Sequence, residues 1–427
     1  MKKLVSLVAL GVAGALALAG CTTNGGGTTS PTSSAPAGAN LRVWLVGPDT
    51  PQAARDYLKT TFEAQNPGST LAIEEQSWTG LVDKYTAALS GSDAPDVVEI
   101  GNTQAPAFTS AGAFLDLTAQ KAALGGSDLL PGFVDIGSYN GKFYAAPYYS
   151  GARVVTYSSD IFTGTVPTTW DAFLAAAKGA TTADVSGLWM PGKDWRNFMT
   201  FVWVNGGDIA TQGADGKWTA GFESPAALKG LQQLSDMYAT ANHAPADADD
   251  AYAPEVTAFC ASQMNFMMFA SWIAGSIQAA PDKGGCGDTI GAQAKVHQFA
   301  VPGLTAGSFA PVLAGGSNLA IPAKSKNPDL ALKALQIMLS DDYQKILAGA
   351  GMVPAKISQA KFLPASEAST AAGNAAASAK LTPASPKWAD VEGQQIMEDA
   401  FSKIAQGQDV ATVAKDLDAK INAIVNG

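Results

Sequence analysis

The sequence has few of the residues that bind metals. Its 427 residues include three cysteines and two histidines, and neither His243 nor His297 stands at ligand spacing from a cysteine. A zinc site of the usual Cys/His kind is therefore not expected. Residues 247–250 (DADD) resemble a calcium loop faintly but lack its glycine and its distal glutamate. They fit a solvated acidic turn better, and we expect neither a metal nor a cofactor.

Basic residues are also scarce. The chain has 27 Lys and Arg against 37 Asp and Glu, a formal net charge of -10 at pH 7. Nucleic acid is bound by a basic face that neutralises phosphates. The composition therefore argues against nucleic acid as a partner, and against general affinity for anionic lipid.

Recognisable catalytic motifs are missing. No HExxH, phosphate-loop or GxGxxG pattern stands between a strand and a helix, and no GxSxG nucleophile elbow is present. We expect no enzymatic activity. Paired carboxylates for glycoside hydrolysis need only be close in space, so a secreted glycoside-active enzyme stays an alternative.

One long apolar run is present, at residues 4–19, after Lys2 and Lys3. A membrane span needs about 20 apolar residues, whereas a basic start, a shorter apolar core and small residues are typical of a secretion signal. The run ends in Leu-Ala-Gly-Cys, which resembles the bacterial lipobox. This resemblance implies that residues 1–20 are removed and that Cys21 is acylated; the alternative is an ordinary signal peptide.

The chain after Cys21 consists of small and polar residues as far as residue 40. Such a segment cannot bury enough apolar surface to offset its ordering entropy, so residues 21–40 are predicted to be a flexible tether. Cys260 and Cys286 then remain as a pair in an exported protein, which predicts a disulfide. Two buried free thiols are the alternative.

Strands and helices alternate from residue 41 onwards. Apolar runs at residues 41–46, 70–75 and 96–100 are separated by amphipathic helices, a pattern that predicts a parallel sheet. Ligands bind such sheets beyond the carboxyl ends of the strands. The loops at those ends carry four polar or aromatic side chains, which are either ligand-binding or simple turn residues: Asp49, Trp78, Asn102 and Gln104.

Several motifs in a fixed order resemble one family. They are residues 95–104 (PDVVEIGNTQ), 139–149 (YNGKFYAAPYY), 167–173 (PTTWDAF), 205–207 (NGG) and 315–321 (GGSNLAI). Together they are similar to the sugar-binding proteins of ABC importers, extracellular solute-binding protein family 1. The resemblance implies an α/β fold of the two-lobed periplasmic-binding-protein type (type II-like), with ligand in a cleft between the lobes. It implies lobe I at residues 41–147 and 312–353, and lobe II at 148–311 and 354–427, including the C-terminal helices.

Sugars present C–H faces, which aromatic rings cover, and hydroxyls, which amides and carboxylates bind. The leading stacking candidates are Tyr148, Tyr149 and Trp272, followed by Trp44, Trp78, Trp189 and Met352. The hydrogen-bonding candidates are Asp49, Asn102, Gln104, Arg196 and Ser317, with Gly316 beside them. Packing in a core is the alternative for each aromatic residue.

The resemblance implies a monomeric receptor on the outer face of the cell membrane, tied there by lipid alone. It would capture a mono- or oligosaccharide and deliver it to the transmembrane subunits of an ABC permease. A receptor of the same fold for peptide or a polyol is a further alternative.

Cys21→Ala should abolish lipidation and leave an unprocessed precursor, because acylation requires the thiol. Detergent phase partition of labelled cells is the measurement. Wild-type protein is expected in the detergent phase, since two or more acyl chains give stable anchoring. A variant that is processed and partitions like wild type would show that the anchor lies elsewhere.

Overall fold

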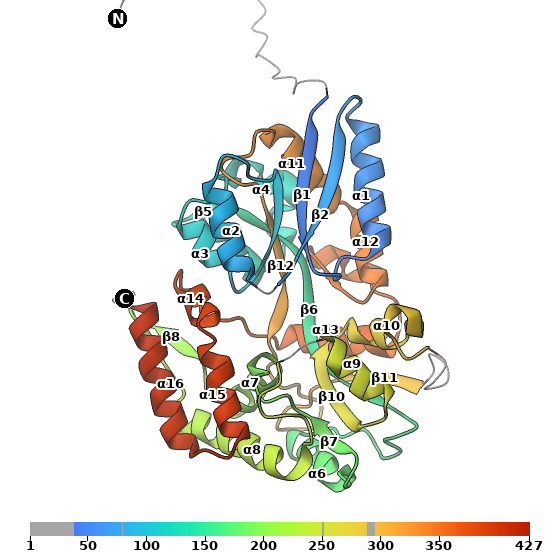
Figure 1. Ribbon diagram of the computed structural model, residues 1–427, viewed down its shortest axis with the longest axis vertical. Helices are drawn as coiled ribbons and strands as arrows, with labels where there is room; N and C mark the ends of the chain where they lie inside the picture. Colours follow the sequence, from blue (N-terminus) through green and yellow to red (C-terminus); the bar gives the residue numbers. More distant parts are fainter. Residues whose placement is uncertain (1–37, 79, 250–251, 288–294) are drawn as a thin grey trace, which may run out of the picture. The chain divides into compact units, whose positions relative to one another are not determined.

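The computed structural model describes residues 38–78, 80–249, 252–287 and 295–427 (Figure 1). The predicted signal peptide, Cys21 and nearly all of the tether lie outside the described residues, as does Asp250 of the acidic turn. Within the described ranges, no helix is both long and apolar enough to cross a membrane. The chain from residue 38 builds two α/β lobes.

The first lobe is built on a mixed sheet. Strand β1 pairs in parallel with β2 and β3, and β12 pairs antiparallel with β3. The strands are β1 (Asn40–Val46), β2 (Thr70–Gln76), β3 (Val97–Gly101) and β12 (Ala314–Ala320), with a hairpin of β4 (Ser138–Tyr139) and β5 (Lys142–Phe143). The helices are α1 (Gln52–Gln65), α2 (Leu81–Ser90), α3 (Ala105–Ser110), α4 (Lys121–Leu124), α5 (Pro131–Ile136), α11 (Pro328–Met338) and α12 (Asp341–Gly349), with short 3-10 turns at Thr118–Gln120 and Gly126–Asp128.

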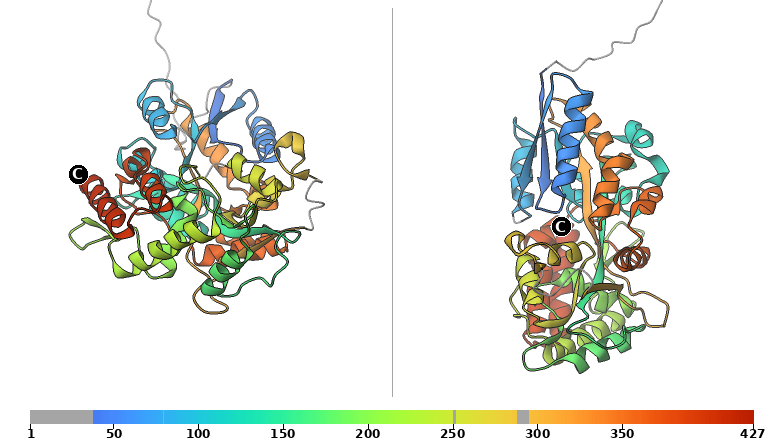
Figure 2. Two further views of the ribbon diagram at one scale, coloured as in Figure 1. Left: turned by 60° about the horizontal axis from the view of Figure 1, so that its bottom comes forward. Right: turned by 90° about the vertical axis from the view of Figure 1, so that its right-hand side faces the viewer.

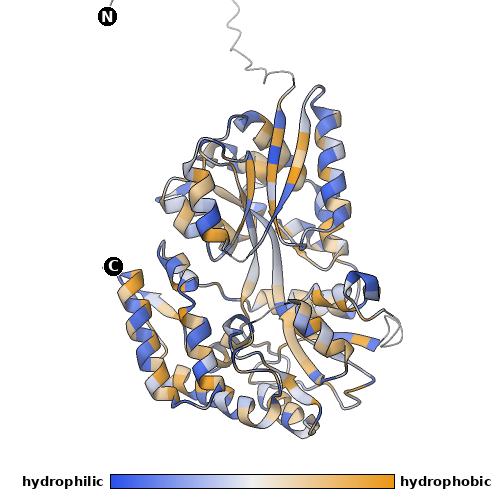
Figure 3. Cartoon of the chain, in the orientation of Figure 1, coloured by the Kyte–Doolittle hydropathy of each residue, from blue (hydrophilic) through white to orange (hydrophobic). Residues whose placement is uncertain are grey.

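Helices cover both sides of this sheet. In the right-hand view of Figure 2, α2 lies on one side of β1 and β2, and α1 lies on the other. Helix α1 buries Ala54, Leu58 and Phe62, which recur every four residues as the sequence pattern predicts. Its visible face in Figure 3 is largely hydrophilic, whereas β10 of the second lobe is mostly hydrophobic.

The second lobe has its own sheet around β6. Strand β6 (Ala145–Ser158) pairs antiparallel with β10 and β11, and β10 pairs in parallel with β7. The other strands are β7 (Ser186–Trp189), β8 (Ala210–Gln212), β9 (Trp218–Ala220), β10 (Met264–Ala270) and β11 (Val296–Ala300). The helices are α6 (Trp170–Ala180), α7 (Trp195–Val204), α8 (Pro225–Ala241), α9 (Tyr252–Cys260), α10 (Ile273–Ile277), α13 (Glu367–Ala377), α14 (Trp388–Gly393), α15 (Ile396–Ala405) and α16 (Val410–Val425), with a 3-10 turn at Pro281–Lys283.

Three chain segments join the lobes. Strand β6 belongs to both sheets, and β12 pairs with it from Ala314 opposite Ala152 to Ala320 opposite Ala145. The third segment passes Lys380, whose backbone N–H donates to the Val312 carbonyl at 2.7 Å, and then Leu381, which packs on the core of the first lobe. The two-lobed fold expected from the sequence is thus confirmed.

One detail differs from the expected lobe boundaries. Lobe I was expected to end at residue 353, but β13 (Val353–Pro354) and the 3-10 turn Ile357–Phe362 continue along it. Lys356 Nζ donates to the Leu339 carbonyl at 2.8 Å, and Ser358 Oγ donates to Asp128 at 2.6 Å. Near the C-terminus, α14 and α15 are separate helices, because Gln395 between them has a left-handed backbone (φ 54°).

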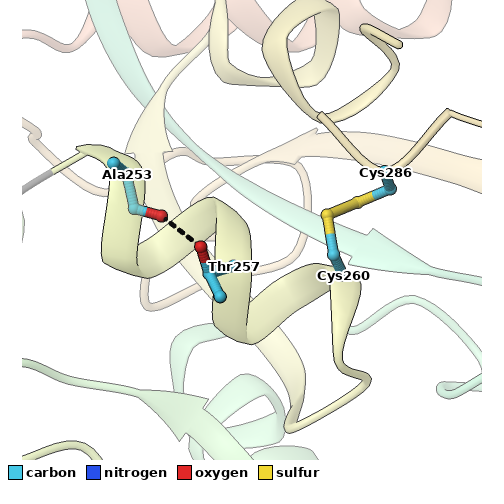
Figure 4. The surroundings of a disulfide bond; sticks show 4 residues. All are labelled: Ala253, Thr257, Cys260 and Cys286. Carbon is cyan, nitrogen blue, oxygen red and sulfur yellow. Dashed lines mark hydrogen bonds between the residues drawn. A yellow bond between two sulfur atoms is a disulfide. The ribbon is translucent and has the colours of Figure 1, made fainter. Parts of the chain in front are cut away.

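Cys260 and Cys286 form a disulfide, with their Cα atoms 5.2 Å apart (Figure 4). Cys260 is the last residue of α9, whose Thr257 hydroxyl donates to the Ala253 carbonyl one turn earlier at 2.8 Å. The bridge spans 26 residues of sequence and so encloses β10, Trp272 and α10 in one covalent loop.

Replacing both cysteines, Cys260→Ser with Cys286→Ser, should destabilise the second lobe by about 3 kcal/mol, because the unfolded chain regains the freedom of that loop. Urea denaturation with and without reductant is the measurement. Reductant should lower the midpoint of wild type and leave the double variant unchanged. Two titratable thiols in denatured, unreduced wild-type protein would contradict the bridge.

Candidate ligand-binding site

The loops after β1, β2 and β3 meet at one edge of the first-lobe sheet. Trp78 is 38% exposed, and its indole Nε1 donates to Asp49 Oδ2 at 3.2 Å. The ring approaches the backbone closely at two points: a Cβ added at Gly47 would stand 3.0 Å from its Nε1, and one added at Gly101 would stand 3.1 Å from its Cζ3. Glycine at these two positions therefore lets a flat aromatic ring approach the chain closely beside a carboxylate.

Tyr149 extends this cluster into the protein. Its hydroxyl lies 3.3 Å from Asp49 Oδ2 and 3.0 Å from Glu99 Oε1. Glu99 has no exposed surface, and its other oxygen accepts the Val46 backbone N–H at 2.9 Å. Asp49, Trp78, Tyr149 and Glu99 thus form one connected group, which we call the carboxylate cluster.

Burial disfavours ionisation in this cluster. Desolvation raises the pKa of Glu99 to about 7, and the neighbouring Asp49 charge adds to this, although hydrogen bonds to the carboxylate oppose it. Desolvation also raises the pKa of Asp49, against hydrogen bonds from Trp78 and Tyr149 and the positive charges of Arg153 and Arg55. Both carboxyl groups therefore stay protonated, and so uncharged, to a higher pH than exposed carboxyl groups do.

Asn102 and Gly316 fix the strands beneath the cluster. Asn102 Nδ2 donates to the Ala314 carbonyl at 2.6 Å, and its backbone N–H donates to the Gly316 carbonyl at 3.0 Å. Gly316 has φ 137°, and any Cβ there would collide with the Tyr149 carbonyl oxygen. Ser317, fully buried, stands opposite both Gly101 and Tyr149. Gln104 is the N-cap residue of α3, and its buried Oε1 accepts no hydrogen bond from a described residue.

The second lobe contributes Trp272, directly after β10. Its ring packs edge-on against Phe269, with centroids 5.4 Å apart, and is half-buried. A Cβ on Gly151 would lie 3.6 Å from its indole nitrogen. Its neighbour Ser271 donates to the Gly351 carbonyl at 3.0 Å. Trp272 therefore lies beside the point where β6 passes between the lobes.

Other candidates lie deeper. Tyr148 is fully buried, and its hydroxyl contacts Thr50 Oγ1 at 2.9 Å and Tyr343 at 2.6 Å. Met352 is 2% exposed, and Trp189 packs beside the hydrophobic cluster around β10. The pairing with β12 passes from Tyr149 to Pro147, so β6 bulges at Tyr148 and the two adjacent tyrosine rings touch edge-on, with centroids 4.9 Å apart. Only the Tyr149 hydroxyl hydrogen-bonds to the carboxylate cluster.

Arg196 lies in a contact between the lobes. It forms ion pairs with Glu398 (3.3 Å) and Glu392 (3.9 Å). Glu392, on α14, also accepts the Thr103 hydroxyl from the loop after β3 at 2.9 Å. This loop of the first lobe is thereby hydrogen-bonded to a helix of the second.

Sequence reasoning missed Glu99, Glu392 and Arg153. Glu99 could have been suspected, because it is the one charged residue within an otherwise apolar strand, β3. Arg153 follows the lobe crossing in β6, and its Nε donates to Asn197 Oδ1 at 2.9 Å. Glu392 carries no comparable signal. Within the described ranges, no three His, Cys, Asp or Glu side chains are grouped to hold a metal ion.

Comparison with known proteins identifies the family. The model of the bacterial extracellular solute-binding proteins matches residues 47–345. The chain is 31% identical over 394 residues to the diacetylchitobiose binding protein DasA of Streptomyces coelicolor, covering 90% of each chain. This chain belongs to the bacterial extracellular solute-binding protein family.

Solved structures agree on the fold of this solute-binding protein. The GacH receptor of Streptomyces glaucescens has a TM-score of 0.77 at 20% identity, covering 91% of this chain and 98% of that one. An ABC transporter solute-binding protein of Thermotoga lettingae, bound with α-D-tagatose, gives 0.76 at 20% identity and covers 91% and 100%. The two-lobed architecture is common to all three chains.

Trp272→Ala should weaken ligand binding about 30-fold, because truncating an aromatic anchor at a binding site costs about 2 kcal/mol or more. Isothermal titration calorimetry measures the change, and circular dichroism checks the fold. Trp218→Ala is the matched control, because Trp218 is a half-buried indole in the β8–β9 hairpin, away from β10. Equal dissociation constants for Trp272→Ala and wild type would place Trp272 outside the site.

Proposed function

We propose that this protein is the substrate-binding lipoprotein of an ABC transporter, and that it captures a mono- or oligosaccharide outside the cell. The observation that carries the proposal is the exposed Trp78 indole fixed by a hydrogen bond to Asp49 at the edge of the sheet. A flat ring beside a carboxylate matches a sugar, whose C–H face stacks on the ring while its hydroxyls donate to the acid.

The family relative selects the first ligand to test. DasA is described as a diacetylchitobiose binding protein, and the likeness to it runs through nearly the whole chain. We therefore place N,N′-diacetylchitobiose first among candidate ligands. We propose that one disaccharide contacts both Trp78 in the first lobe and Trp272 in the second.

Binding should favour approach of the lobes. A ligand shifts an equilibrium between conformations only by its difference in affinity for them. A sugar touching both Trp78 and Trp272 gains its full contacts only when both walls face it. The closed form would then be the one presented to the permease.

The remaining parts of the proposal follow from the chain outside the lobes and from the carboxylate cluster. Lipid on Cys21 and the tether of residues 21–40 would hold a monomeric receptor at the outer face of the membrane. Asp49 and Glu99 are a pair of carboxyl groups joined through the Tyr149 hydroxyl. Glu99 has no exposed surface, so these two cannot flank a glycosidic bond, and we propose binding without chemistry.

A panel of mono- and oligosaccharides that includes N,N′-diacetylchitobiose tests the function by thermal shift, followed by chromatography of the sugar. Ligand at 100 times its dissociation constant should stabilise the protein by about 2.7 kcal/mol and raise its melting temperature. The sugar should be recovered intact. Cleavage at a rate proportional to protein would make it an enzyme, and a shift with peptides or polyols alone would redirect the proposal to those ligands.

A further inference from the structure

A single hydroxyl links two buried carboxyl groups in the carboxylate cluster. The Tyr149 hydroxyl is within hydrogen-bonding distance of Glu99 (3.0 Å) and of Asp49 (3.3 Å). It carries one proton, so it can donate to only one of them at a time. Which carboxyl group accepts the hydrogen bond depends on whether Glu99 is ionised.

The protonated form of Glu99 leads to one arrangement. A proton on Oε1 is donated to the Tyr149 oxygen, and the Tyr149 O–H then donates to Asp49 Oδ2, which already accepts the Trp78 N–H. Among the described residues, no hydrogen bond reaches the other oxygen of Asp49, Oδ1. Asp49 is thus held by two donors through one oxygen, with the second oxygen available to a ligand hydroxyl.

The ionised form of Glu99 leads to the other. The carboxylate then accepts the hydrogen bond of the Tyr149 O–H, because it has no proton of its own to donate, and Asp49 keeps only the Trp78 donor. Two negative charges then share a poorly solvated space, and like charges there disfavour each other strongly. A ligand that covers Asp49 removes water that would otherwise screen this repulsion.

The other groups around Glu99 do not neutralise it. Tyr85, on α2, donates its hydroxyl to the Glu99 backbone carbonyl at 2.7 Å, not to the carboxyl group. Ser317, on β12, approaches the carboxyl group and favours its charged form. Several titratable or charged groups interact electrostatically with Glu99 or with its neighbours. They are Asp49, Tyr85, Tyr148, Tyr149, Tyr343, Arg55 and Arg153. The two arginines favour the charged form of Asp49.

We propose that Glu99 is a positioning residue for sugar binding: protonated, it turns the Tyr149 hydroxyl toward Asp49 and holds that carboxylate ready for a ligand hydroxyl; ionised, it withdraws this support. The inference rests on the proposed function, and deepens it by adding a protonation step to the same site. Affinity should therefore be highest below neutral pH and fall as the pH rises. The pKa of Glu99, raised by burial to about 7, puts the change near neutrality.

Calorimetric titration with N,N′-diacetylchitobiose from pH 5.5 to 8.5 is the test. If ligand raises the pKa of Glu99 by about one pH unit, affinity falls about tenfold across this range, because one pKa unit corresponds to a factor of ten. Glu99→Gln keeps a donor toward Tyr149 and an acceptor for the Val46 N–H at every pH. Its affinity should therefore stay constant with pH.

Two further variants separate positioning from a general effect of the fold. Tyr149→Phe removes the link, so its affinity should be lower and nearly independent of pH. Tyr343→Phe is the matched control: it deletes a fully buried hydroxyl that contacts Tyr148 and neither carboxyl group, and it should titrate like wild type. A Glu99→Gln or Tyr149→Phe profile that titrates like wild type would overturn the proposal.

A measurement without ligand keeps the test independent of the sugar. A carboxyl group whose pKa is raised on folding stabilises the protein at low pH, and this stability is lost as pH rises from about 4.5 to about 7. Wild-type melting temperature should fall over that interval relative to Glu99→Gln. Parallel curves would show that Glu99 does not titrate as proposed. If the curves diverge but no sugar binds wild type at any pH, the proposed function fails, and with it the role of Glu99 in binding.

Discussion

The pairing of β6 with β12 is the interaction on which the rest of the structure depends. Both strands pass from one lobe to the other, and the register between them determines which of their residues are neighbours. Ser317 lies opposite Tyr149 on one side and Gly101 on the other, which brings β3 and β6 together around β12. The register shifts between Ser317 and Asn318, and such an irregularity re-aims side chains locally. The phenol of Tyr149 thus reaches Glu99 through the backbone arrangement itself.

This arrangement brings two backbone segments close together and buries a carboxyl group without an ion-pair partner. Gly316 has to be glycine, because its backbone angle and the Tyr149 carbonyl leave no room for a Cβ. Glu99 is buried with hydrogen bonds but with no ion pair among the described residues. Such features lower stability, and proteins retain them mainly at functional sites. Their position under Asp49 and Trp78 supports a binding role for the whole cluster.

The sequence predicts the fold better than the side-chain partners. Repeating apolar positions such as Ala54, Leu58 and Phe62 define helix faces. The placing of three strand-end loops at one sheet edge predicts that Asp49 and Trp78 lie close together. The surroundings of Glu99 could not be foreseen in the same way, because Val46 and Tyr149 are about 50 residues away on either side. The break at Gln395 depends on a left-handed residue that carries no glycine signal. Strand alternation would also have assigned Tyr148 and Tyr149 to opposite faces, whereas the bulge in β6 brings their rings into contact.

The disulfide has a consequence for how the protein is made. The bond encloses β10 and Trp272, so the proposed second-lobe wall of the site is completed by an oxidation that cytosolic thiols oppose. If the chain is exported as proposed, this bond forms after it has left the cytosol. A chain produced in a reducing cytosol would have the same sequence but no disulfide around β10 and Trp272. Protein prepared from the cytosol and protein prepared after export would therefore not be interchangeable.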